Sequence, residues 1–250
     1  MRDVSSRVSP WFFALLGVTL AGGSVAALAT SKAMLTIGIV ALVLGGWAVS
    51  LCLHEFGHAY TAYRGGDRSV RDKGYLTLDI RRYADLGLSL VLPVFFLLIG
   101  GIPLPGGAVW IDHGAIRSRA VRSLVSLAGP AANLLIGVLL TVAIAVAPMP
   151  VGLAAGLSAL ALIQVLAFVL NILPVPGLDG FGVIEPYLSD SARRTAARVR
   201  PWAPIALFVL IIGVPGVSSW LFGLGDAVFA ALGGDGSLAY VGYQTLFFWR

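Results

Sequence analysis

Two histidines and a glutamate lie close together at His54-Glu55-Phe56-Gly57-His58. On a helix, the pattern H-E-x-x-H places the two imidazoles one turn apart on the same face, where both can bind one zinc ion. The glutamate is then placed to accept a proton from a water molecule at the metal. Because the 250 residues include only three histidines, a chance occurrence is improbable. The motif predicts a zinc hydrolase site with Glu55 as general base.

The surroundings of this motif predict a membrane setting. Residues 35–53 and 59–63 are nearly all apolar, and the whole chain is 58% apolar and only 12% charged. Globular proteins carry about 25% charged residues, so composition excludes an ordinary soluble domain. The net charge is +5, and the basic residues form a few clusters. We expect these clusters to face anionic lipid, and we expect no nucleic-acid partner.

Apolar stretches predict an all-α multispan membrane protein with about five to six transmembrane helices. We expect one integral-membrane domain over residues 1–250, with a first span at 11–30, a catalytic core at 34–188 and C-terminal spans within 201–232. Within the core, the expected spans are 34–63, 120–147 and 153–173. A cleaved signal peptide is the alternative for the first span, but its length favours an uncleaved helix.

Basic residues also predict the orientation of the chain. They follow both the 34–63 span and the 153–173 span, and basic clusters mark cytoplasmic loops. We therefore expect a multi-pass protein of the cell membrane with its zinc motif toward the cytoplasmic side.

Between the second and third spans, we expect a short membrane-associated β-hairpin and a re-entrant segment. Residues 74–80 alternate apolar and polar side chains, which is typical of a strand, and residues 108–111 are a candidate second strand. Residues 86–99 are apolar but too short to cross comfortably, and Pro93 interrupts them. A re-entrant path keeps both basic flanks on one side, and we prefer it to a crossing.

A catalytic zinc site usually needs a third protein ligand. The candidates are His113 and acidic residues near membrane depth, chiefly Asp179 and Glu185. Asp179 follows a span that ends level with the zinc motif, so we prefer Asp179 to His113. Read alone, Leu178-Asp179-Gly180 is also ordinary turn chemistry.

Three sequence motifs, the last of them in two parts, together resemble those of a known family. They are His54-Glu55-Phe56-Gly57-His58, Ala128-Gly129-Pro130 with Asn133, Asn171-Ile172-Leu173-Pro174, and Leu178-Asp179-Gly180. In order and spacing they are similar to the motifs of the site-2 protease family of intramembrane zinc metalloproteases, in its compact prokaryotic type without a PDZ or CBS module. Tyr83 departs from the pattern, since many compact members have histidine there.

The resemblance implies specific roles for these residues. One zinc ion per chain would be held by His54, His58 and Asp179, with Glu55 as the catalytic base. Asn133 and Asn171 would help to hold the substrate or the developing oxyanion, although either could simply bond between helices. The implied substrate is a transmembrane protein within the lipid bilayer, which could pair with the edge of the strand at 74–80.

Two other classes of function remain as alternatives. A membrane metal transporter can also bury histidines and carboxylates, but we find none of the repeated halves that transporters tend to show. A catalytically inactive relative of the same fold is the second alternative, against which the intact Glu55 argues. The sequence carries no signal for an oligomeric state.

Overall fold

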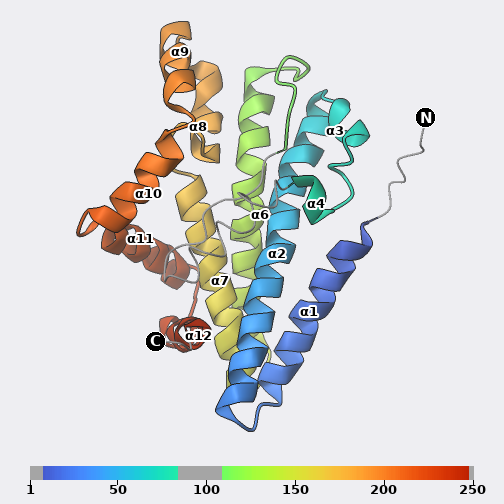
Figure 1. The fold of residues 1–250 in the computed structure, drawn as a ribbon, viewed down its shortest axis with the longest axis vertical. Helices are drawn as coiled ribbons and strands as arrows, with labels where there is room; N and C mark the ends of the chain where they lie inside the picture. Colours follow the sequence, from blue (N-terminus) through green and yellow to red (C-terminus); the bar gives the residue numbers. More distant parts are fainter. Residues whose placement is uncertain (1–7, 84–108, 248–250) are drawn as a thin grey trace.

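Four long helices form the body of the protein in the computed structural model, which describes residues 8–83 and 109–247 (Figure 1). They are α1 (Pro10–Ala27), α2 (Lys32–Gly65), α6 (Arg119–Val146) and α7 (Val151–Asn171). The shorter helices are α3 (Ser69–Asp72), α4 (Ile80–Tyr83), α8 (Asp179–Ile184), η2 (Glu185–Tyr187), α9 (Asp190–Val199), α10 (Ala203–Gly213), α11 (Val217–Ala231) and α12 (Gly236–Leu246).

Polar caps set the ends of the long helices. The Ser31 side chain accepts a hydrogen bond from the N–H of Met34 at 3.2 Å at the start of α2. Ser118 caps α6 in the same way through the N–H of Val121 at 3.2 Å. α2 ends at Gly66, whose φ of 129° is open to glycine but strained for other residues. These caps mark where the 34 residues of α2 begin and end.

α2 and α7 form the interior of the bundle. Within their most apolar segments, 61% and 72% of residues are buried, against 17% for α1 and 28% for α6. α1 packs closely on α2, because a Cβ at Gly38 would lie 2.4 Å from the backbone nitrogen of Ala26. The outward faces of α1 and α6 carry exposed large apolar side chains, including Phe13, Leu20 and Leu139. Such faces suit lipid, and the protein is a membrane protein.

Among the described residues, four helices are long and apolar enough to cross a membrane. A fifth span results if α9 and α10, which meet at a bend of 62°, are counted as one. This is fewer than the upper figure of six that we expected. α11 has 15 residues, or about 22 Å at 1.5 Å per residue, which is too short for a bilayer core of about 30 Å.

The prediction of a β-hairpin is wrong. Residues 73–77 form turns and a bend, and neither 74–80 nor 109–111 is a strand. Leu78 has a left-handed φ of 54°, which breaks the extended path. The segment instead folds onto the start of α1, where the N–H of Ser9 donates to the carbonyl of Thr77 at 2.7 Å. The expected re-entrant segment at 86–99 lies outside the described residues.

Candidate metal centre

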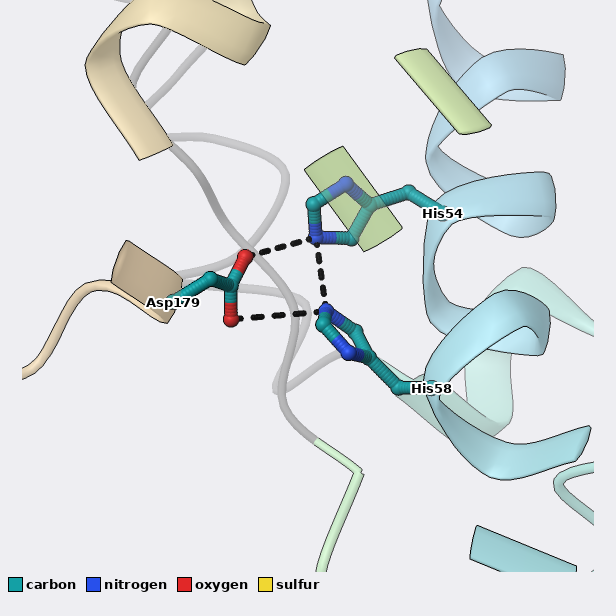
Figure 2. A group of neighbouring side chains, drawn as sticks. All are labelled: His54, His58 and Asp179. Atoms are coloured by element: carbon teal, nitrogen blue, oxygen red, sulfur yellow. Dashed lines mark hydrogen bonds and ion pairs between the residues drawn. The ribbon is translucent and has the colours of Figure 1, made fainter. Parts of the chain in front are cut away.

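His54 and His58 lie one turn apart on the same face of α2, as their spacing predicts. Each residue is only 6% exposed. Their Nε2 atoms are 3.1 Å apart and point to the same position beside the helix (Figure 2). α2 therefore offers two nitrogen donors to one ion from within the bundle.

Asp179 reaches this position from the start of α8 (Figure 2). After α7 ends, the chain reverses through residues 172–178, where Gly177 has a φ of 103°. Asp179 then places Oδ2 3.3 Å from Nε2 of His54 and Oδ1 3.4 Å from Nε2 of His58. As a carboxylate, Asp179 offers an anionic oxygen donor, which is one of the ligand types that zinc accepts.

The three donor groups fit a zinc ion of the catalytic type. Their ligand atoms all lie within 4.8 Å of one another, and no further His, Cys, Asp or Glu from the described part of the chain joins them. Tetrahedral ligands about 2.0 Å from zinc are about 3.3 Å apart. The separations of 3.1, 3.3 and 3.4 Å match that value. Two nitrogens, one oxygen and an open fourth position are typical of hydrolytic zinc sites.

Each imidazole makes a hydrogen bond through its Nδ1 atom, on the side of the ring away from the metal position, and this leaves Nε2 facing that position. Nδ1 of His54 donates to Oδ1 of Asn133 at 2.5 Å. Nδ1 of His58 donates to the carbonyl of Val125, also on α6, at 2.6 Å. A proton on each Nδ1 leaves each Nε2 with a free lone pair for a metal.

Gly129 of α6 forms one wall of the metal position. A Cβ at this residue would lie 2.2 Å from Nε2 of His58 and 2.6 Å from Nε2 of His54. The helices also approach closely at Gly57, where a Cβ would lie 2.9 Å from the carbonyl oxygen of Ala128. Gly57 and Gly129 are therefore required for steric reasons, because only residues without a side chain allow the α6 backbone to lie this close to the donors.

Glu55 is the one acidic side chain of α2, and only 3% of it is exposed. It is close enough to His54, His58 and Asp179 to interact electrostatically with all three. It also receives a backbone hydrogen bond from Val109. Position and burial suit a carboxylate that handles protons beside the metal.

The remaining predicted residues lie at different distances from the centre. Oδ1 of Asn133 accepts the hydrogen bond from Nδ1 of His54, so this amide oxygen already has a partner within the protein. Asn171 ends α7 and is buried, but no contact described joins it to the three donors. His113 is not part of the donor group; it lies among Glu185, Arg122, Arg200 and Asp112. The substrate-binding roles of Asn133 and Asn171 stay predictions.

Sequence reasoning missed Gln164, whose Oε1 accepts a hydrogen bond from Nδ2 of Asn133 at 2.7 Å. A signal was available, because α7 is otherwise apolar around this position. A polar side chain in such a span points to a specific partner.

Comparison with known proteins finds relatives that are named as zinc metalloproteases. The chain is 45% identical over 249 residues to the "Putative zinc metalloprotease Rip2" of Mycobacterium tuberculosis, covering 98% of this chain and 95% of that protein. The protein of the same name from Mycolicibacterium smegmatis is 43% identical over the same shares. The "Putative zinc metalloprotease YwhC" of Bacillus subtilis is 30% identical over 174 residues, 66% of this chain and 77% of that protein. No family model and no solved structure matches.

The fold and the site thus define a membrane zinc metalloprotease. The chain belongs to the site-2 protease family, in its compact form. The donor group and these relatives together support zinc as its cofactor.

Proposed function

We propose that this protein hydrolyses peptide bonds in or near the transmembrane segments of other membrane proteins. The observation that carries the proposal is the convergence of His54, His58 and Asp179, with Glu55 beside them, on helices that belong to an apolar bundle. A zinc donor set with a buried base is suited to hydrolysis, and its placement among apolar helices suits a substrate that arrives through the lipid.

The chain's own residues account for the proposed steps. Zinc, when bound, polarises a substrate carbonyl and makes a water molecule more acidic. The Glu55 carboxylate takes a proton from the attacking water and then delivers it to the nitrogen of the broken peptide bond. Asn133 and the carbonyl of Val125 keep both imidazoles in the tautomer that binds metal. We further propose that Asn171 contacts the substrate.

We propose that the active site opens toward the cytoplasm of a multi-pass protein in the cell membrane. The C-terminal ends of α2 and α7 lie at the same end of the bundle, next to α3 and α8 (Figure 1). Basic residues gather at and beyond these ends. Arg64 lies in the last turn of α2, Arg68, Arg71 and Lys73 follow α2, and Arg193, Arg194, Arg198 and Arg200 lie in and after α9. An excess of Lys and Arg marks cytoplasmic segments. Water can reach a site at this depth.

Cleavage by the purified full-length protein tests the proposal. We expect a single-span membrane protein, mixed with this protein and zinc in detergent micelles, to be cut within or beside its span. Glu55→Gln should still bind zinc but lose cleavage, because the amide cannot accept the proton. Equal cleavage by both proteins would refute the mechanism. Zinc-dependent ion flux into vesicles without cleavage would indicate a transporter, and zinc binding with neither activity would indicate an inactive relative.

A further inference from the structure

A chain of hydrogen bonds runs from His54 across three helices. Nδ1 of His54 on α2 donates to Oδ1 of Asn133 on α6, and Nδ2 of Asn133 donates to Oε1 of Gln164 on α7. The distances are 2.5 and 2.7 Å. Exposure falls along the chain, from 6% for His54 to 5% for Asn133 and 0% for Gln164. Gln164 is thus fully enclosed, and two hydrogen bonds connect it to the metal donor His54.

The orientation of the Asn133 amide decides which His54 nitrogen carries the proton. With Oδ1 toward the ring, the proton lies on Nδ1, and Nε2 keeps its lone pair. With the amide turned over, its NH₂ group would face Nδ1, and the ring proton would have to sit on Nε2. Nε2 is the atom that faces Asp179 and His58. A protonated Nε2 cannot bind a metal.

Gln164 supplies the contact that resists this reversal. If the Asn133 amide turned over while Gln164 kept its orientation, two amide oxygens would face each other in a buried site. Gln164 uses only its acceptor here, since its buried Nε2 has no hydrogen-bond partner among the residues that the structure describes. Burying an amide that is only partly bonded costs stability, so a purely structural explanation of this residue is weak.

We propose that Gln164 is a positioning residue for the zinc site, and that its Oε1 holds Asn133 in the orientation that keeps Nε2 of His54 free to bind metal. This inference deepens the proposed function and rests on His54 as a zinc ligand. It assigns to Asn133 the task of orienting the ligand, in addition to any contact with substrate.

Zinc affinity of three variants tests the proposal. Full-length protein in maltoside micelles is stripped of metal and titrated with Zn²⁺ in competition with a chromophoric chelator. Gln164→Met, which lacks both polar atoms, should weaken zinc binding roughly 10–100-fold, as is typical when a partner behind a ligand is lost. In this enclosed site the carboxyl group of Gln164→Glu should stay protonated, so it keeps an acceptor oxygen and carries a hydroxyl in place of the NH₂ group. Its zinc affinity should therefore stay within about threefold of the wild type. Ser158→Ala is the control, because Ser158 is also buried on α7 and its hydroxyl has no partner within the described part of the chain.

A double-mutant cycle separates positioning from general damage. If Gln164 acts through Asn133, the pair Asn133→Ala and Gln164→Met should bind zinc no more weakly than Asn133→Ala alone. Cobalt-loaded Gln164→Met should also show an altered visible spectrum, because the geometry of the ligands changes. Thermal unfolding of the metal-free proteins identifies any variant that does not fold, and Gln164→Leu replaces Gln164→Met in that event.

Two results would overturn the inference. One is wild-type zinc affinity in the folded apolar variant, Gln164→Met or its replacement Gln164→Leu, which would leave Gln164 a packing residue. The other is a loss in Gln164→Glu as large as in Gln164→Met, which would remove the acceptor role. Both readouts are of metal binding, so they stand even where the wild type cleaves no membrane protein and the proposed function fails.

Discussion

Gly129 and His58 share one small volume, because a Cβ on Gly129 would lie 2.2 Å from Nε2 of His58. The same Cβ would lie 2.6 Å from Nε2 of His54, so it would occupy the space between the donors. We therefore expect Gly129→Ala to reduce zinc affinity by more than the roughly 10–100-fold seen when outer partners of ligands are lost. The measurement is zinc content after purification, followed by competition with a chelator.

A matched control for Gly129→Ala exists on α11. Gly223 also lies inside a helix, and a Cβ there would meet nothing within 4 Å. Gly223→Ala should keep wild-type zinc affinity. Wild-type affinity in Gly129→Ala as well would mean that the metal does not sit against this part of α6.

The choice between Asp179 and His113 as third ligand makes a separate prediction. Asp179→Asn replaces an anionic donor with a neutral amide, so zinc binding should fall at least 10-fold, whereas His113→Ala should bind as the wild type does. Asp190→Asn controls for the loss of an acidic residue near the same end of the bundle, since Asp190 pairs only with Arg193 in the described structure. If His113→Ala weakened zinc binding and Asp179→Asn did not in a chelator competition, the third ligand would be His113, in the loop before α6, and not Asp179.

Local patterns predicted much of this fold and most of its candidate site. Length and hydropathy located the four long helices to within a few residues, because a bilayer of fixed thickness demands a fixed run of apolar residues. His54 and His58 are neighbours through helix geometry alone. Asp179 needed one further step, namely that two spans run in the same direction and end at the same level.

Contacts that depend on how helices rotate against each other could not be predicted. Gln164 contacts Asn133 because α6 and α7 turn particular faces toward one another. Since α7 is apolar on nearly all sides, its sequence pattern does not show which of its faces packs against α6. The prediction of a strand at 74–80 was wrong for a similar reason. Its alternation is real, but the turn depends on Leu78 and on a partner, Ser9, far away in the sequence.

The Asp67 carboxylate connects the end of α2 to the loop before α6 through hydrogen bonds. Because these bonds favour the ionised form, we expect the stability of the protein to depend on pH. Its Oδ1 accepts from the N–H and hydroxyl of Ser69 at 2.9 and 2.7 Å, and its Oδ2 accepts from the N–H of Asp112 at 2.8 Å. Burial acts to raise the pKa of Asp67, but these hydrogen bonds and the charge of Lys73 outweigh burial and lower it. A folded pKa below the unfolded value of about 3.9 stabilises the protein above that pH, and the stabilisation is lost as pH falls through the folded pKa.

Asp67→Asn should therefore destabilise the protein at pH 7 by about 1–3 kcal/mol, because one N–H donor now faces an NH₂ group. The difference from the wild type should shrink as pH falls below about 4, where the unfolded chain takes up a proton at Asp67, and should vanish once the folded carboxylate is protonated too. Thermal unfolding across pH measures both effects, with Asp72→Asn as control because Asp72 is exposed on the adjacent α3. A constant difference from pH 7 to pH 3 would contradict the role of the charge.

Zinc should stabilise the folded protein, because its donors come from α2 and from α8, which are far apart in the sequence. An ion that binds only the folded state adds about 2.7 kcal/mol when its free concentration is 100 times Kd. Chelation should lower the thermal midpoint, and zinc, but not magnesium, should restore it, since Mg²⁺ prefers oxygen ligands. His54→Ala with His58→Ala should show a low midpoint that neither treatment changes. A midpoint that is insensitive to chelation in wild-type protein proven to have lost its zinc would show that α2 and α8 are held together without the metal.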